Sequence, residues 1–181
     1  MIETERLLLR PPEEADVDAV YRIVSDPEVM RFLDPTGATY GPDDAARRIE
    51  AYRRAWELDG FGHFMLVPRD SGEAIGRVGL LVWDTATWEH GTRHDIGDEG
   101  QLELGWTLER TAWGKGYATE GALAVRDWVM GELRPERLIS LIHADNVRSM
   151  RVATKIGEEY RHDVVTHGGI TLGLWQLRSP S

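Results

Sequence analysis

One stretch of this sequence, residues 101–121, constrains the fold more than any other. It reads QLELGWTLERTAWGKGYATEG, so an alternating apolar run leads into a glycine-rich turn and then into the start of a long amphipathic segment. The order strand, glycine turn, helix directs backbone N–H groups and the positive end of a helix dipole at one place, an arrangement that binds anions. We therefore predict that this turn holds a phosphate-bearing cofactor and that the preceding strand presents the reactive groups.

The remainder of the chain predicts helices alternating with strands, without an internal repeat or a linker. Apolar periodicity and turn residues predict further strands over 5–10, 63–67, 74–83, 137–142, 159–165 and 170–177, and helices over 16–24, 43–58, 116–132 and 147–156. Residues 29–39 and 84–99 are interpreted as loops. This order predicts an α/β (α+β) protein, with a mixed sheet and helices on its faces, in a single domain covering residues 1–181.

Composition excludes several classes of function. The formal net charge is −10, with a pI near 5.1, and this argues against a nucleic-acid partner because binding phosphates along a duplex requires a basic face. The absence of cysteine removes thiol nucleophiles, disulfides and Cys-based zinc sites. No apolar run reaches the roughly 18–20 residues of a membrane span. We expect a cytoplasmic protein without a membrane partner, as a monomer or a homodimer.

The familiar phosphate-binding and catalytic motifs are absent. A dinucleotide fingerprint requires Gly or Ala where Thr119 stands, and a Walker P-loop requires Gly where Glu109 stands. The G-x-S-x-G and HExxH patterns do not occur. His90, His94 and Asp95 lie close together in a glycine-containing polar segment, where a solvated loop is the better interpretation, so no metal site is expected.

The glycine turn therefore remains as the candidate anion site. Backbone amides from Gly114 to Thr119 would line a pyrophosphate at the start of the helix, and the glycines would let the backbone approach it closely. Lys115 supplies one mobile cation, although a solvated turn lysine is the competing interpretation.

At this point the sequence resembles a known family. Residues 113–120, WGKGYATE, resemble the acetyl-CoA-binding motif of the GNAT superfamily of N-acetyltransferases, written Arg/Gln-x-x-Gly-x-Gly/Ala, and in particular the branch that acetylates ribosomal-protein N-termini. Downstream, NVRS at 146–149 followed by KIG at 155–157 resembles that branch's Asn-x-x-Ser…Lys-Leu-Gly-Phe segment. Upstream, ETERLLLR at 3–10 resembles its usual opening. These motifs occur in the same order and cover nearly the whole chain.

The resemblance implies a fold and a cofactor. The fold is a single-domain, mostly antiparallel sheet of about six to seven strands flanked by about four helices, with its fourth and fifth strands splayed apart. Acetyl-CoA would place its pantetheine in that gap and its pyrophosphate on the glycine turn, and CoA would be the product. The cofactor-binding residues implied are Trp106, Leu108, Trp113, Gly114, Lys115, Gly116, Tyr117, Ala118, Thr119, Asn146 and Ser149.

The sequence departs from the family pattern at three positions. Trp113 stands where the motif has Arg or Gln, so backbone amides must carry more of the phosphate binding. Ala153 stands where many relatives place a tyrosine general acid, and Glu158 replaces the usual Phe after Gly157.

Acetylation of an amine by a thioester needs an oriented amine, a proton acceptor and a polarised carbonyl. Glu103 is the candidate general base, since a carboxylate among apolar neighbours has a raised pKa; the alternative is a solvent-facing strand glutamate. Ser149 is the candidate acid for the leaving thiolate, with bulk water as the alternative. Asn146 also suits the role of a helix N-cap, and Tyr117 suits the core as well as a ligand site.

The sequence thus predicts an acetyl-CoA-dependent N-acetyltransferase that transfers acetyl directly to a primary amine in a ternary complex. The acceptor is either a protein N-terminus or a small molecule such as an amino acid, a polyamine or an antibiotic. Residues 30–39 and 84–99 would shape its pocket. The alternative is a non-catalytic acyl-CoA-binding or sensing module on the same fold.

Overall fold

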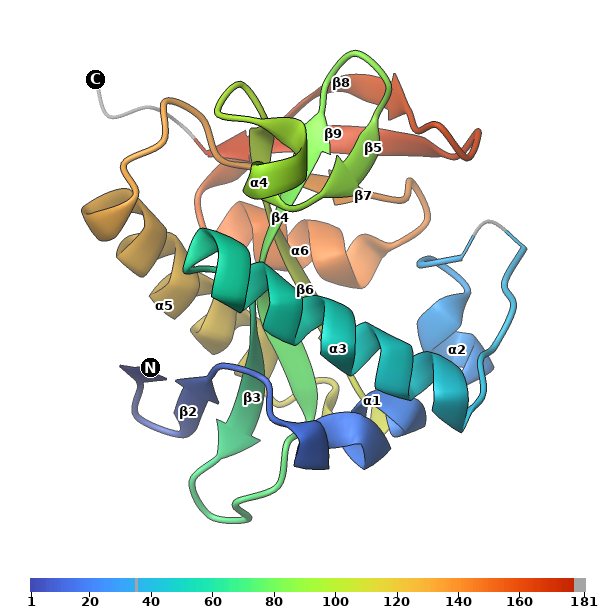
Figure 1. Ribbon diagram of the computed structural model, residues 1–181, viewed down its shortest axis with the longest axis vertical. Coiled ribbons are helices and arrows are strands. Elements are labelled where there is room, and N and C mark those ends of the chain that lie inside the picture. Colours follow the sequence, from blue (N-terminus) through green and yellow to red (C-terminus); the bar gives the residue numbers. More distant parts are fainter. Residues whose placement is uncertain (35, 178–181) are drawn as a thin grey trace.

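The computed structural model describes residues 1–34 and 36–177, in which a nine-stranded sheet carries helices on both faces (Figure 1). The strands are β1 Ile2–Glu3, β2 Leu7–Arg10, β3 His63–Pro68, β4 Gly76–Asp84, β5 Glu89–Gly91, β6 Gln101–Leu108, β7 Ile139–Ile142, β8 Glu158–Val165 and β9 Thr171–Leu177. The helices are α1 Val17–Val24, α2 Pro27–Met30, α3 Pro42–Asp59, α4 Arg93–Ile96, α5 Tyr117–Glu132 and α6 Val147–Lys155. Two short 3₁₀ turns, η1 Glu14–Asp16 and η2 Arg110–Ala112, precede α1 and follow β6.

The sheet is antiparallel except at one place in its middle. Its order is β1-β2-β3-β4-β6-β7-β9-β8, with β5 paired to β4. The pairing of β6 with β7 is parallel and is registered only at Glu103 and Ile139. Just beyond that point the carbonyl oxygen of Leu104 accepts a hydrogen bond from the Ser140 hydroxyl (2.7 Å). These two strands are the fourth and fifth predicted from the sequence, and the mixed sheet with a splayed central pair is confirmed.

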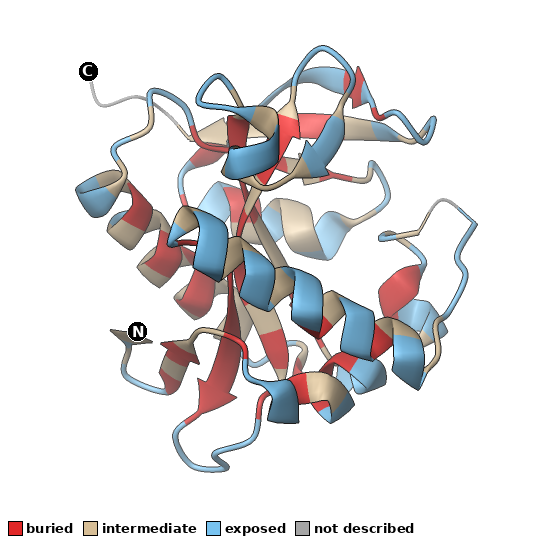
Figure 2. Cartoon of the chain, in the orientation of Figure 1, coloured by how far each residue is buried: buried red, intermediate tan, exposed pale blue. Residues whose placement is uncertain are grey.

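The two faces of β6 have different surroundings, because side chains alternate along a strand. Leu102, Leu104 and Leu108 belong to the main core, which also contains the apolar stripe of α5. The intervening residues, Glu103 and Thr107, line a cavity on the opposite face. In Figure 2 the buried residues follow the central strands and the inward side of the helices.

A second, smaller core attaches α1, α2 and α3 to the sheet. It contains Val20 and Ile23 of α1, Ile49 of α3, and Met65 and Val67 of β3. Helix α3 begins with Pro42 at its first turn and ends at Gly60, whose left-handed φ of 73° closes the helix. This packing fixes α1 and α3 over the sheet face that carries Glu103.

The prediction of six to seven strands and four helices was too low, and the elements that it missed are all short. They are β1, β5, α2 and α4, none longer than four residues. Residues 84–99, interpreted as a loop, contain β5 and α4. The Asp59 carboxylate accepts hydrogen bonds from the backbone N–H groups of Arg93 (2.6 Å) and His94 (3.0 Å). Such tertiary support leaves no periodic signal in the sequence.

Within residues 1–34 and 36–177, no helix combines the length and the apolar character needed to cross a bilayer.

Candidate active site

The glycine turn has a backbone that only glycine adopts easily. Gly114 and Gly116 have φ values of 75° and 85°, in the left-handed region. A Cβ atom at Gly114 would meet nothing within 4 Å, whereas one at Gly116 would lie 3.3 Å from the guanidinium of Arg6. Gly116 precedes the 16-residue helix α5, and no side chain of the described residues caps that end. The first amides of α5 therefore face outward as free donors.

A cavity of about 370 Å³ opens at this turn, and we call it the turn cavity. Ten of the eleven cofactor-binding residues expected from the sequence line it, namely Trp106, Leu108, Trp113, Gly114, Gly116, Tyr117, Ala118, Thr119, Asn146 and Ser149. Lys115 is the exception. It is exposed and lies outside the lining, although its carbonyl oxygen accepts a hydrogen bond from Arg6 (2.9 Å).

The glycine turn is tied to the N-terminal segment by three residues that we call the N-terminal clasp: Thr4, Arg6 and Glu120. The Glu120 carboxylate accepts hydrogen bonds from the Thr4 hydroxyl (2.6 Å), the Arg6 backbone N–H (2.9 Å) and the Arg6 Nε (2.7 Å). Burial alone would raise the pKa of Glu120, but these hydrogen bonds outweigh it and hold the pKa below its usual value. The opening motif and the glycine motif are thus one physical unit.

Trp113, which replaces the expected Arg or Gln, is covered by a cation. The guanidinium carbon of Arg148 lies 4.4 Å from the centroid of its ring, and the indole N–H donates to the Leu108 carbonyl (2.9 Å). Arg148, Arg151 and Lys155 all line the turn cavity from α6. Their spacing of three and four residues, which places them on one helical face, was the sequence signal for this basic wall.

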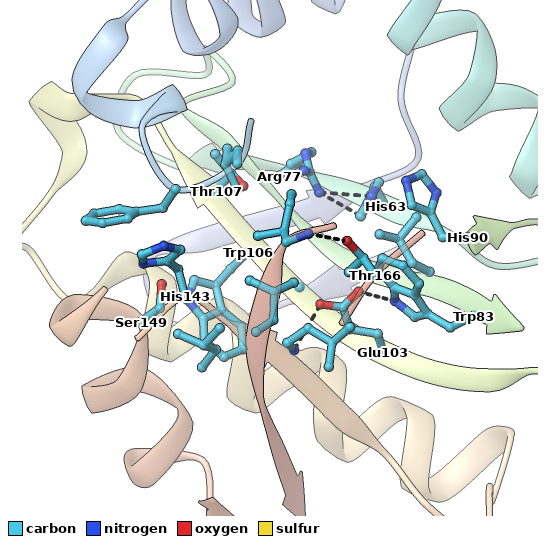
Figure 3. Close-up of a pocket in the computed structure, with 18 of the residues that line it drawn as sticks. His63, Arg77, Trp83, His90, Glu103, Trp106, Thr107, His143, Ser149 and Thr166 are labelled. Atoms are coloured by element: carbon cyan, nitrogen blue, oxygen red, sulfur yellow. Dashed lines mark hydrogen bonds between the residues drawn. The ribbon is translucent and has the colours of Figure 1, made fainter. Parts of the chain in front are cut away.

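A second cavity of about 650 Å³ lies on the face of β6 that points away from the main core, and we call it the strand cavity (Figure 3). Arg77 of β4 and Glu103 and Thr107 of β6 line it. The two predicted acceptor loops also reach it, contributing Met30, Phe32, Leu33, Trp88, Glu89 and His90.

The two cavities meet where β6 and β7 separate. Six residues line both: Phe32, Leu33, Trp106, Thr107, Asn146 and Ser149. A molecule in the turn cavity and another in the strand cavity would therefore contact each other through the gap in the sheet.

Glu103 is buried in the wall of the strand cavity, with 7% of its surface exposed, so the alternative of a solvent-facing glutamate is wrong. Its carboxylate accepts hydrogen bonds from the Trp83 indole (2.5 Å) and the Leu141 backbone N–H (3.2 Å). Burial raises the pKa of Glu103, against the opposing effects of these hydrogen bonds and of the charge on Arg77. Each oxygen keeps a lone pair, so the carboxylate can still accept a proton.

Helix α6 presents the remaining predicted residues at the junction. The Asn146 side-chain oxygen accepts a hydrogen bond from the Ser149 backbone N–H (3.2 Å), which confirms the N-cap interpretation and leaves the amide NH₂ free. The Ser149 hydroxyl forms no hydrogen bond to the described part of the chain. Ala153 is fully buried and lines neither cavity, so it takes no part in the site. Thr107, which the sequence did not single out, adds a second hydroxyl there.

Glu158, where the family has Phe, is a buried acid outside both cavities. The Ser140 hydroxyl lies 2.7 Å from the Leu104 carbonyl and 3.0 Å from Glu158 Oε1. Ser140 has a single hydroxyl proton and the carbonyl can only accept, so a protonated Glu158 carboxyl satisfies both contacts at once. Burial raises its pKa to about 8, and the charge on Glu103 adds to the shift.

The histidines of the polar segment do not form a metal centre. His90 lines the strand cavity with its ring against Trp83, whereas His94 belongs to α4. Among residues 1–34 and 36–177, no group of three or more His, Cys, Asp or Glu side chains is arranged to hold a metal ion.

Comparison with known proteins places the chain in a family. Residues 6–159 match the family model described as Acetyltransferase (GNAT) domain, and the chain belongs to this family. The uncharacterized N-acetyltransferase YnaD of Bacillus subtilis is 31% identical over 156 residues, which cover 86% of this chain and 81% of YnaD. A crystal structure of an acetyltransferase from Agrobacterium tumefaciens is 28% identical, with a TM-score of 0.77 over 98% of this chain and 94% of its own.

More distant structures share the fold. AAC(6')-Ib, solved with paromomycin and acetyl-CoA, is 18% identical with a TM-score of 0.75 over 96% of this chain and 93% of its own. A proposed ribosomal-protein-serine acetyltransferase from Vibrio cholerae is 17% identical with a TM-score of 0.71 over 97% of this chain and 94% of its own. At these identities the likeness concerns the fold alone.

Proposed function

We propose that this protein is an acetyl-CoA-dependent N-acetyltransferase that transfers the acetyl group directly to a primary amine in a ternary complex. The observation that carries the proposal is the meeting of the two cavities at Trp106, Thr107, Asn146 and Ser149. Membership of the GNAT family and the acetyl-CoA bound to AAC(6')-Ib, a structure of the same fold, support it.

The turn cavity suits the cofactor because its chemistry fits an anion with an extended apolar tail. The left-handed glycines leave the approach to the α5 amides open, and Arg148, Arg151 and Lys155 supply positive charge. Trp106 and Leu108 give the cavity an apolar side next to the gap. Lys115, exposed at the tip of the turn, is free to contact a phosphate from outside the cavity.

When bound, acetyl-CoA supplies a thioester whose C–S bond breaks as the C–N bond of the product amide forms. Glu103 takes the proton that the amine nitrogen loses, directly or through a water molecule. The Ser149 hydroxyl, at the junction of the cavities, is placed to give a proton to the departing sulfur and to recover one from solvent. The amide and the free thiol of CoA are the products.

The test combines binding with turnover. We expect isothermal titration to detect CoA and acetyl-CoA, and we expect acetyl-CoA to release free thiol only when a suitable amine is added. The amine panel should contain amino acids, polyamines, aminoglycosides and peptides with free N-termini. Binding without amine-dependent thiol release would show a sensing module instead, and an absence of CoA binding would contradict the proposal entirely.

A further inference from the structure

Two arginines of the strand cavity have no carboxylate partner. Arg77 of β4 and Arg48 of α3 both line the cavity and are only partly exposed. Among residues 1–34 and 36–177, neither forms an ion pair within 4.0 Å, in contrast to neighbours such as Arg47 and Arg22. Arg48 lies over the Tyr40 ring, with its guanidinium carbon 4.9 Å from the centroid. A partly buried, unpaired cation is costly unless an anion joins it.

The contact between Arg77 and His63 does not neutralise the charge on Arg77. One guanidinium nitrogen of Arg77 lies 2.9 Å from Nε2 and 3.3 Å from Nδ1 of His63. A guanidinium only donates hydrogen bonds, so the imidazole must accept and is therefore neutral. Burial, together with the charge on Arg77, keeps the pKa of His63 well below its usual value. Figure 3 shows this pair in the cavity wall, close to His90.

In the described part of the chain, no carboxylate lies within ion-pair distance of Arg48 or Arg77, although Glu103 and Asp44 are near enough for these charges to lower their pKa values. The Glu89 carboxylate faces His167, with 3.4 Å between Glu89 Oε1 and Nε2. Both oxygens of Glu103 are held by Trp83 and Leu141.

His90 and His143 also line the cavity. Burial lowers the pKa of His90, and the charges of Arg77 and Arg48 lower it further. The positive charges of Arg48 and Arg77 therefore both reach the part of the cavity that His90 lines.

The strand register places the cations next to the junction with the turn cavity. Arg77 is the cross-strand partner of Thr107, which lines both cavities, while Glu103 lies opposite Leu81. Between these pairs lies Gly105, where a Cβ atom would meet only Glu103 Oε1, at 3.9 Å. Along this face of the sheet, the Arg77 cation, the open space over Gly105 and the Glu103 carboxylate therefore lie one after another.

We propose that the acceptor is an α-amino carboxylate with an aromatic or apolar side chain, its carboxylate bound by Arg77 and Arg48 and its amine directed to the Thr107–Ser149 junction. This inference rests on the proposed function. A carboxylate one carbon from the amine can reach Arg77 while the amine stays beside Thr107. Most of the remaining lining is apolar or aromatic, including Ile23, Met30, Phe32, Leu81, Trp83 and Trp88. The amine loses one proton, which water in the open space over Gly105 carries to Glu103, as its C–N bond forms and the thioester C–S bond breaks; the departing CoA sulfur takes a proton from Ser149.

Three matched acceptors test the role of the carboxylate: L-phenylalanine, L-phenylalaninamide and 2-phenylethylamine. With acetyl-CoA and thiol detection, we expect kcat/KM for the amino acid to exceed that for the other two by about 10- to 100-fold, the range expected for a charge-assisted hydrogen bond. Titration of L-phenylalanine into the protein without cofactor gives a second readout, where we expect heat of binding that the amide does not produce.

Two variants and one control test whether Arg48 and Arg77 bind the acceptor carboxylate. We expect Arg48→Gln and Arg77→Gln each to raise KM or Kd for L-phenylalanine about tenfold or more, with CoA affinity unchanged and the preference in kcat/KM for L-phenylalanine over 2-phenylethylamine reduced. Arg47→Gln is the matched control, because Arg47 is adjacent on α3 but pairs with Asp44 and does not line the cavity. Since Arg77 touches the buried His63, its variant needs a thermal unfolding check; Arg48 has no such contact.

The outcomes separate this inference from the proposed function. Equal use of the amide or of 2-phenylethylamine by the wild type, or unchanged L-phenylalanine KM and Kd in both variants, would overturn the amino-carboxylate assignment while leaving the N-acetyltransferase intact. Absence of thiol release with every amine would overturn the proposed function. In that case arginine-dependent binding of L-phenylalanine would still support the carboxylate site, and its absence would remove it.

Discussion

The turn cavity and the strand cavity are built in different ways. The turn cavity is centred on the segment 113–119, where two glycines set the geometry of the backbone groups, and α6 adds its basic side chains. The strand cavity collects residues from α1, α2, α3, α6, β3, β4, β5, β6, β7 and β9, together with the connections between them. Backbone recognition is local and leaves a motif in the sequence. Side-chain recognition is non-local, so the acceptor site can change residue by residue while the cofactor site stays the same.

The largest expected effect is at the turn cavity, with Gly116→Val. The left-handed φ of 85° costs an L-residue about 1–2 kcal/mol, and the new side chain would crowd Arg6 and cover the α5 amides. We expect CoA binding to fall by at least about 100-fold in isothermal titration, while the fold persists.

Gly72→Val is the matched control for Gly116→Val. Gly72 has a φ of 72° in an exposed turn between β3 and β4, away from both cavities. It should carry a similar strain without loss of CoA binding. Unchanged CoA affinity in Gly116→Val would remove the pyrophosphate assignment.

Next in size is Glu103→Gln, which affects the strand cavity alone. We expect turnover near neutral pH to fall by about 10²- to 10⁴-fold, the usual contribution of a general base, with CoA affinity unchanged. Because the pKa of Glu103 is raised by burial, the wild-type rate should fall as acidification protonates this carboxylate. A pH–rate profile that overlays the wild-type profile would show that Glu103 is not the base.

Glu158→Gln provides a buried-acid comparison outside both cavities. The folded-state pKa of about 8 lies above the ordinary glutamate pKa of 4.5, so the folded protein holds a proton that the unfolded chain releases. The contribution of Glu158 to the free energy of unfolding is therefore complete below pH 4.5 and is lost as pH rises to about 8.

A glutamine side chain can donate to Ser140 as the protonated acid does, so Glu158→Gln should retain the fold and its turnover. We expect urea unfolding at a series of pH values to show a smaller decline in stability with pH for this variant. Identical pH dependence of the two proteins would show that Glu158 is ionised in the folded state.

The smallest effect is expected from Arg148→Gln in the turn cavity. Arg148 is exposed in the wall of the turn cavity, and an exposed ion pair, here with a cofactor phosphate, contributes about 0.2–1 kcal/mol. We expect CoA affinity to fall about two- to fivefold, with a weaker dependence on salt than in the wild type. Arg47→Gln serves again as the exposed control, and an equal loss of affinity there would show a general charge effect.

Ten of the eleven residues expected from the sequence line the turn cavity, and there is a physical reason for this. Gly114 and Gly116 need their φ values whatever surrounds them, and Asn146 caps its helix through a contact three residues away. The splayed strands followed from the family resemblance, and they coincide with the gap between β6 and β7.

The sequence pointed to Glu103 and to the two loops of the strand cavity but not to its arginines, because these depend on register and on which helical face is turned inward. Arg47 and Arg48 are identical neighbours in the sequence, yet only Arg48 lines the cavity. Arg77 becomes important because it pairs with Thr107, and Glu103 because Trp83 and helices α1 and α3 enclose its side of the sheet. These contacts join residues that are far apart in the sequence, so no spacing of residue types along the chain predicts them.

The N-terminal clasp has a consequence for the order in which the protein assembles. Arg6 and Glu120 are 114 residues apart, so residues 4–6 are synthesised well before the partner that they contact. Contacts of such long range form late, after the loop-closure entropy has been overcome. We expect the anion-binding turn to reach its final rigidity only when residues 4–6 dock, and to be among the first regions to loosen when the terminal strands β1 and β2 fray.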